Sequence, residues 1–80
     1  MAVKVIFLGP LQDMAGEQER SVAAPLDWDG LLREVGPQIA GQLQDDRVNV
    51  ACASRVLADK TSLDARDGDE VALLPPVSGG

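Results

Sequence analysis

Histidine and tyrosine are absent from this 80-residue sequence, and cysteine, tryptophan and phenylalanine each occur once. The lone cysteine, Cys52, cannot form a disulfide within the chain, and without histidine there is no Cys/His cluster of the kind that holds zinc. The side chain that most often acts as a general base near neutral pH is also missing. We therefore expect neither a bound metal nor a bound cofactor.

Long hydrophobic runs and clustered basic residues are missing as well. No run of about 18 apolar residues occurs, so no segment is predicted to span a membrane. The apolar run that ends at Gly9-Pro10 is too short for a secretory signal, and we expect a cytoplasmic location. The formal net charge is −6 and the basic residues are scattered singly, which argues against nucleic acid as a partner. An acidic chain of this size is better suited to a basic patch on another protein.

The first half of the sequence predicts two strands and a helix. A strand over residues 3–8 is indicated by β-branched content, and a second, short strand is indicated over 20–23. A short helical turn over 10–15 lies between them and ends at Gly16, and residues 16–18 are predicted to form a tight connection, as in a hairpin. The longer helix begins with Asp27 as a plausible N-cap. Its apolar stripe, at spacings of three and four, consists of Trp28, Leu31, Leu32 and Val35.

Gly36-Pro37 is predicted to end that helix, and residues 38–43 to form another helical turn. The second half then predicts strands over 48–53, 55–57 and 70–74, the last of them after the turn Asp67-Gly68-Asp69. Cys52 lies in the apolar run of the first of these strands. It is either a buried, inert thiol or a nucleophile that handles sulfur.

This order of elements predicts an α+β domain over residues 1–74, in which one amphipathic helix covers one face of a mixed, four- to five-stranded sheet. Both faces carry apolar residues, so the two could be exchanged, but we expect side chains of one parity to face the helix: Val3, Val5, Phe7, Val71 and Leu73. Side chains of the other parity should form an uncovered apolar patch, which is typical of a protein interface: Ile6, Leu8, Ala72 and Leu74.

Residues 75–80 are predicted to form a C-terminal tail, Pro75-Pro76-Val77-Ser78-Gly79-Gly80. The two prolines fix their own φ and stiffen its start, whereas the two glycines give a flexible end that can enter a passage too narrow for a Cβ. Fully extended, the tail reaches roughly 20 Å. It is suited to delivering the carboxylate of Gly80 into a partner's active site, although a Gly-Gly end alone also fits a frayed terminus.

The sequence resembles the ubiquitin-like β-grasp sulfur carriers, and among them the MoaD family of molybdopterin synthase small subunits. Three segments carry the resemblance: Val5-Ile6-Phe7-Leu8 with Leu11, Met14, Ala15 and Gly16; Asp67-Gly68-Asp69-Glu70-Val71-Ala72; and Leu74-Pro75-Pro76-Val77-Ser78-Gly79-Gly80. The resemblance implies that an E1-like enzyme of the MoeB type uses ATP to adenylate Gly80, which then becomes a thiocarboxylate. The tail would enter a large subunit of the MoaE type, within a heterotetramer, and give its sulfur to cyclic pyranopterin monophosphate.

The resemblance also implies an interface with the large subunit formed by Leu8, Val56 and Leu74, of which the first and last are often aromatic in the family. Two further departures are Ala53, where the family often has Asn, and Gly30, where a helix-favouring residue is usual. Three other functions stay open. They are a sulfur carrier for thiamine thiazole, a protein modifier joined through Gly80 to lysines, and a binding module whose tail is idle.

Overall fold

The computed structural model describes residues 1–76, and every structural statement below concerns that part of the chain. Its main sheet has five strands: β1 (Ala2–Phe7), β2 (Glu19–Ala23), β4 (Asn49–Cys52), β5 (Arg55–Val56) and β7 (Glu70–Leu74). The other elements are helices α1 (Pro10–Ala15) and α2 (Trp28–Leu43), the 3-10 helix η1 (Lys60–Ser62), and the two-residue strands β3 (Leu26–Asp27) and β6 (Asp64–Ala65). None of the helices in this part of the chain combines the length and hydrophobicity needed to cross a bilayer.

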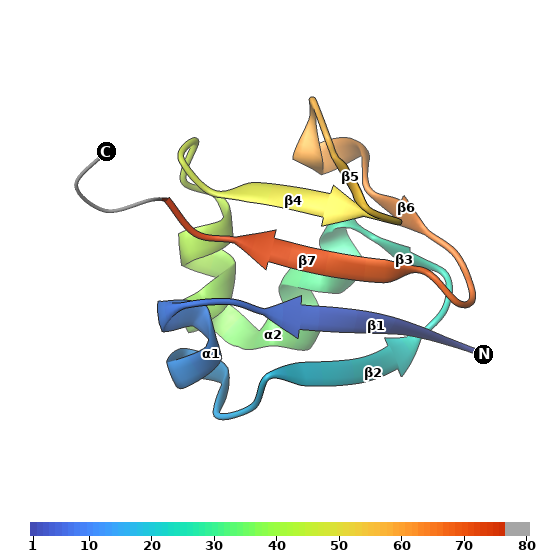
Figure 1. Ribbon diagram of the computed structural model, residues 1–80, viewed down its shortest axis with the longest axis horizontal. Coiled ribbons are helices and arrows are strands. Elements are labelled where there is room, and N and C mark those ends of the chain that lie inside the picture. Colours follow the sequence, from blue (N-terminus) through green and yellow to red (C-terminus); the bar gives the residue numbers. More distant parts are fainter. Residues whose placement is uncertain (77–80) are drawn as a thin grey trace.

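The main sheet has the strand order β2-β1-β7-β4-β5, so the first and last strands of the chain lie together at its centre (Figure 1). β1 and β7 are parallel, and the other neighbouring pairs are antiparallel. The predicted α+β class and mixed sheet are therefore confirmed. Both central strands have apolar side chains on each face, as expected for strands without an open edge.

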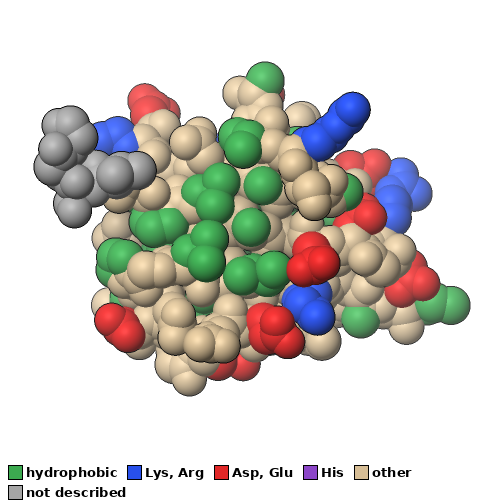
Figure 2. Space-filling view, in the orientation of Figure 1, with side chains coloured by type: hydrophobic (Ala, Val, Ile, Leu, Met, Phe, Trp, Pro, Cys, Tyr) green, Lys and Arg blue, Asp and Glu red, His purple; other side chains and the backbone are tan. Residues whose placement is uncertain are grey.

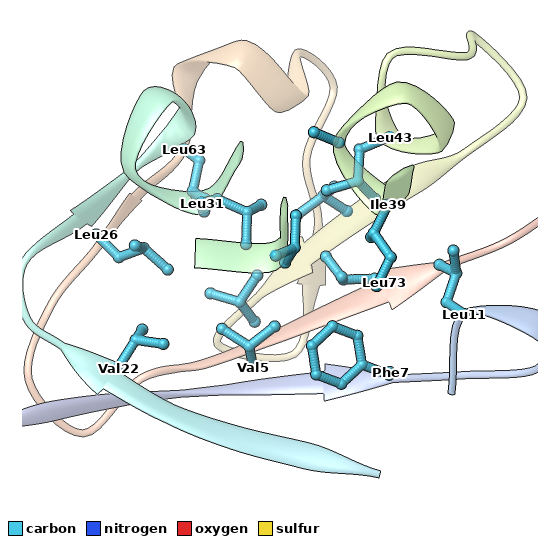
Figure 3. Packing of buried hydrophobic residues seen from close by; sticks show 14 of the residues in the cluster. Val5, Phe7, Leu11, Val22, Leu26, Leu31, Ile39, Leu43, Leu63 and Leu73 are labelled. Atoms are coloured by element: carbon cyan, nitrogen blue, oxygen red, sulfur yellow. The ribbon is translucent and has the colours of Figure 1, made fainter. Parts of the chain in front are cut away.

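Helix α2 packs on one face of this sheet and encloses the core. The side chains predicted to face the helix are all buried: Val3, Val5, Phe7, Val71 and Leu73. Figure 3 shows side chains of β1 and β7 packed against Leu31, Ile39 and Leu43 of α2. Trp28, the first residue of the predicted apolar stripe, is partly buried and packs against this cluster.

The N-terminus of α2 is capped as predicted, because the Asp27 carboxylate accepts a hydrogen bond from the Gly30 N–H at 2.8 Å. Gly30 is not the weak point that its helix propensity suggests. A Cβ there would lie 3.0 Å from Asp27 Oδ1 and 3.2 Å from Leu26 Cδ1. Glycine at position 30 therefore leaves room for the capping carboxylate of Asp27 and for the side chain of Leu26.

The predicted break at Gly36-Pro37 is confirmed, because Gly36 has φ 87° and ψ 165° and is not helical. The predicted helical segment over 38–43 is present as well, and it follows the kink so directly that both parts are described as one helix, α2. Ile39 and Leu43 of this segment are buried in the core. Near the kink, Arg20 Nη1 donates a hydrogen bond to the Glu34 carbonyl at 2.6 Å and so links β2 to α2.

The connection predicted between the first two strands is confirmed. β1 and β2 pair as antiparallel strands, and the segment that joins them consists of α1 followed by a short turn over 16–18. Gly16 ends α1 in the left-handed conformation, with φ 75°, as its position suggested.

Two further features of the second half concern strand pairing. β3 and β6 form a separate two-stranded sheet that the sequence did not reveal. β4 and β5 form a hairpin whose two connecting residues, Ala53 and Ser54, both have positive φ, at 52° and 69°. Positive φ at both central residues is typical of a type I′ turn, although neither residue favours it.

Candidate functional site

The face of the main sheet opposite α2, here called the open face, is crossed by one row of neighbouring side chains. From β2 to β5 the row consists of Glu19, Ile6, Ala72, Ala51 and Val56, each paired with the next. All but the first are apolar. Apolar surface therefore runs without interruption across four strands.

We call the apolar members of this row, together with the two leucines at the ends of β1 and β7, the apolar patch. It consists of Ile6, Leu8, Ala51, Val56, Ala72 and Leu74. Val56 is 62% exposed and Leu8 39%, so both are accessible to a partner. Figure 2 shows hydrophobic side chains gathered on the middle of the open face and toward the end at which β7 finishes. Ile6, Ala72 and Leu74 are half-buried and Ala51 is buried. An apolar surface with exposed members of this kind is a feature of protein interfaces.

Charged side chains lie at two margins of the apolar patch. Glu19 lies beside Ile6 at the β2 edge, and Glu70 lies at the start of β7, where it pairs with Lys4. Lys4 Nζ is 3.8 Å from Glu19 Oε1. Two carboxylates and one ammonium give this corner of the open face a negative balance, which gives a partner a defined orientation.

The structure places the three predicted interface residues on this face but not in one spot. Leu8 and Leu74 lie where β1 and β7 end, whereas Val56 lies at the edge formed by β5. Ala51 is a member of the patch that sequence reasoning missed. The signal was available, because the buried Val50 fixes the parity of β4 and places its neighbour on the other face.

The described chain ends just beyond β7, at the base of the predicted tail. Pro75 is half-buried and Pro76 is exposed. A Cβ built on Gly9, which follows β1, would lie 3.3 Å from Pro75 Cγ. The remaining predicted site residues, Val77, Ser78, Gly79 and Gly80, lie outside the described residues.

Cys52 lies at the far end of the sheet from Pro75, where it pairs with Val71 at the start of β7. An inert thiol was expected to be buried, but Cys52 is half-buried. Burial raises the pKa of its thiol, and the carboxylates of Asp69 and Asp64 raise it further. The thiolate is therefore disfavoured, which argues against the nucleophile among the two interpretations of this residue.

Among residues 1–76, no three His, Cys, Asp or Glu side chains are grouped so that they could hold a metal ion. One hollow of about 260 Å³ lies beside η1 and is lined in part by Asp46, Asn49 and Lys60. Lys60 Nζ donates hydrogen bonds to the carbonyls of Asp45 and Val48, the second at 2.8 Å. This lysine therefore ties the segment between α2 and β4 to η1.

Comparison with known proteins gives one family. The sequence profile of the ThiS family matches residues 5–80. None of the curated proteins matches the chain.

Three solved structures are similar over nearly the whole chain. A chain in the complex of subunits 1 and 2 of molybdopterin-converting factor from Helicobacter pylori is 28% identical, with a TM-score of 0.63 and 100% of both chains covered. SAMP1 from Haloferax volcanii is 25% identical, with a TM-score of 0.73 and 100% of both chains covered. The small archaeal modifier protein 1 from Methanosarcina acetivorans is 23% identical, with a TM-score of 0.75 and with 99% of this chain and 96% of that one covered; it supports the fold alone. The fold is the ubiquitin-like β-grasp, as the sequence predicted.

Proposed function

The chain belongs to the ThiS family, and from this premise we propose that it is a sulfur carrier whose Gly80 receives sulfur as a thiocarboxylate. We propose further that it is the small subunit of a molybdopterin synthase and gives this sulfur to cyclic pyranopterin monophosphate. Its partners would be a large subunit of the MoaE type, within a heterotetramer, and an adenylating enzyme of the MoeB type that consumes ATP.

One observation carries the proposal: the apolar patch adjoins the point where the chain leaves β7. Leu74 is the last residue of β7 and belongs to the patch, and Leu8 belongs to the patch just beyond the end of the parallel neighbour β1. Pro75 and Pro76 follow directly. A protein that covers the patch therefore holds the start of the tail against its own surface, so the terminal carboxylate can be delivered into that protein.

The proposed chemistry begins at the terminal carboxylate of Gly80. A carboxylate is a poor electrophile, so one of its oxygens first attacks the α-phosphorus of ATP and pyrophosphate leaves. A sulfide nucleophile then attacks the acyl carbon and displaces AMP, which leaves a thiocarboxylate. In the large subunit the thiocarboxylate sulfur attacks a carbon of the pterin precursor and displaces an oxygen substituent, and tethering makes this attack effectively intramolecular. Water then cleaves the acyl–sulfur bond, which leaves the sulfur on the pterin and regenerates the Gly80 carboxylate. None of these steps requires a catalytic side chain from this chain.

The shape of the patch fits docking of this kind. Its centre is formed by two small residues, Ala51 and Ala72, between the larger Ile6 and Val56. The floor is therefore shallow, with taller apolar side chains on both sides. A protruding apolar side chain of the partner would fit over the alanines, and a basic rim would fit the acidic corner formed by Glu19 and Glu70.

A second function, protein modification, is favoured by the similarity to SAMP1. In that case the Gly80 adenylate would react, directly or through a thioester, with a lysine ε-amine and form an isopeptide bond. Activation is the same in both functions, and only the acceptor differs. A carrier for thiamine thiazole would also share the activation step.

Copurification and complementation separate these functions. The chain would be expressed with an affinity tag at its N-terminus in its own host, which leaves Gly80 free, and recovered proteins would be identified by mass spectrometry. The proposal predicts a large subunit of the MoaE type and rescue of a strain that lacks its own molybdopterin synthase small subunit. Recovery of branched Gly-Gly remnants on lysines of other proteins, without such rescue, would favour the modifier instead. Rescue of a thiazole auxotroph alone would favour the thiamine carrier.

A further inference from the structure

Gly9 lies directly against the base of the tail. It follows the end of β1, and the parallel register that pairs Phe7 with Leu73 brings it alongside Pro75, two residues further on. An ideal Cβ on Gly9 would lie 3.3 Å from Pro75 Cγ, closer than most real contacts of a Cβ. The proline ring therefore packs tightly against the position that a Cβ on residue 9 would take.

The backbone at Gly9 requires glycine for a second reason. Its φ is 56° and its ψ −134°, a conformation that other residues adopt only with strain. The turn is held by hydrogen bonds from the Leu11 N–H to the Leu8 carbonyl, at 3.2 Å, and from the Gln12 N–H to the Gly9 carbonyl, at 3.0 Å. Because this turn is anchored to α1, it cannot simply move away from an intruding methyl group.

We propose that Gly9 is a positioning residue for the tail: by lacking a side chain it lets Pro75 seat against the turn between β1 and α1, and this contact sets the direction in which the chain leaves the sheet. The inference rests on the proposed function, because direction matters only if the tail must reach a partner's active site. Gly9 itself would touch neither sulfur nor substrate. It acts through Pro75, at the boundary between the rigid sheet and the residues that deliver the carboxylate.

The chain offers a matched control for the test. Gly16 ends the same helix α1 and also has positive φ, at 75°, but a Cβ there would meet nothing within 4 Å. Gly9→Ala and Gly16→Ala both strain a residue of positive φ beside α1, with ψ −134° at Gly9 and 14° at Gly16, and only Gly9→Ala presses on Pro75. Thermal unfolding of both variants measures the cost in stability of each substitution.

The functional readout uses the carrier in its thiocarboxylate form, prepared by cleaving an intein fusion with sulfide so that no activating enzyme is needed. Sulfur transfer to cyclic pyranopterin monophosphate is then followed with the large subunit. Gly9→Ala is expected to lower the maximal rate about three- to tenfold relative to Gly16→Ala, since small misplacements of a reacting group are costly. The half-saturating concentration of carrier should stay the same, because the apolar patch is untouched. Equal rates for the two variants would overturn the inference.

Pro75→Ala supplies a second test, because it removes the Cγ that the new methyl would meet. In the Gly9→Ala background it should restore part of the rate, whereas in the wild-type background it should lower it. Additive losses in this double-mutant cycle would contradict the proposed contact. A nuclear Overhauser effect between the Gly9 Hα and Pro75 Hγ protons is expected in the free wild-type chain, and its absence would refute the contact even if the proposed function is wrong. Failure of the wild-type thiocarboxylate to transfer sulfur would count against the proposed function alone.

Discussion

Replacing Ala53 and Ser54 by Asn and Gly is expected to stabilise the domain. The two residues form the whole connection between β4 and β5, and both have positive φ. Asn-Gly is the pair that most favours this type of turn. The substitution therefore removes strain from the hairpin without changing its length or its register.

The expected gain is about 1 kcal/mol. A left-handed conformation costs an ordinary residue roughly 1–2 kcal/mol, of which glycine is relieved fully and asparagine partly. Glycine also gives the unfolded chain more freedom, which returns about 0.4–1 kcal/mol at position 54. For a domain of this size, a net gain of about 1 kcal/mol raises the melting temperature by about 4–8 °C.

Thermal and urea unfolding, followed by circular dichroism, would measure this gain. Ser21→Gly is the matched control, because Ser21 is exposed in the interior of strand β2, where glycine should be destabilising. If the Asn-Gly variant melts at or below the wild-type temperature while Ser21→Gly behaves as expected, the turn is not strained and the reasoning fails.

Three further outcomes are expected. In α2, Gly41→Ala should stabilise the domain by about 0.5–1 kcal/mol, because a Cβ there meets nothing within 4 Å. Gly30→Ala should gain nothing or destabilise, because its Cβ crowds the carboxylate of the N-cap Asp27. Urea unfolding of both variants tests the difference. Hydrogen bonds from Arg47 hold the pKa of Asp45 at about 2, below its ordinary 3.8. The contribution of Asp45 to stability is therefore present above about pH 4 and is lost as the pH falls toward 2. An NMR titration should show this pKa, and Arg47→Gln should move the pKa of Asp45 back toward 3.8. Val56→Asp should weaken binding to the large subunit at least tenfold while the unfolding free energy changes by less than about 0.5 kcal/mol; binding as tight as that of the wild type would remove Val56 from the interface.

The fold could be predicted because its strongest signals are local. The apolar faces of β1 and β7 and the stripe of α2 are visible in the order of residues alone. Both faces of these strands carry apolar residues, so only the packing of α2 shows which face of the sheet is covered. The small sheet of β3 and β6 could not be predicted, because two residues are too few to show a period of two and their pairing depends on the rest of the fold. The kink at Gly36 and the helical segment after it were predictable, because Gly-Pro is a local signal to stop a helix and Ile39 and Leu43 are spaced for one helix face.

The candidate site was predictable in its composition but not in its arrangement. Leu8 and Leu74 are exposed or half-exposed beside the base of the tail, as expected, but their separation from Val56 follows from the strand order. The contact between Gly9 and Pro75 joins residues at opposite ends of the chain, and only the parallel pairing of β1 with β7 reveals it.

The most direct test of the central claim is the mass of the intact chain after incubation with ATP, a sulfide source and an adenylating enzyme of the MoeB type. The account predicts the mass increase that corresponds to exchange of one oxygen for sulfur, localised to Gly80 by fragmentation and absent from a chain that lacks Gly79 and Gly80. An unchanged mass, under conditions in which the same enzyme converts a known carrier, would contradict it.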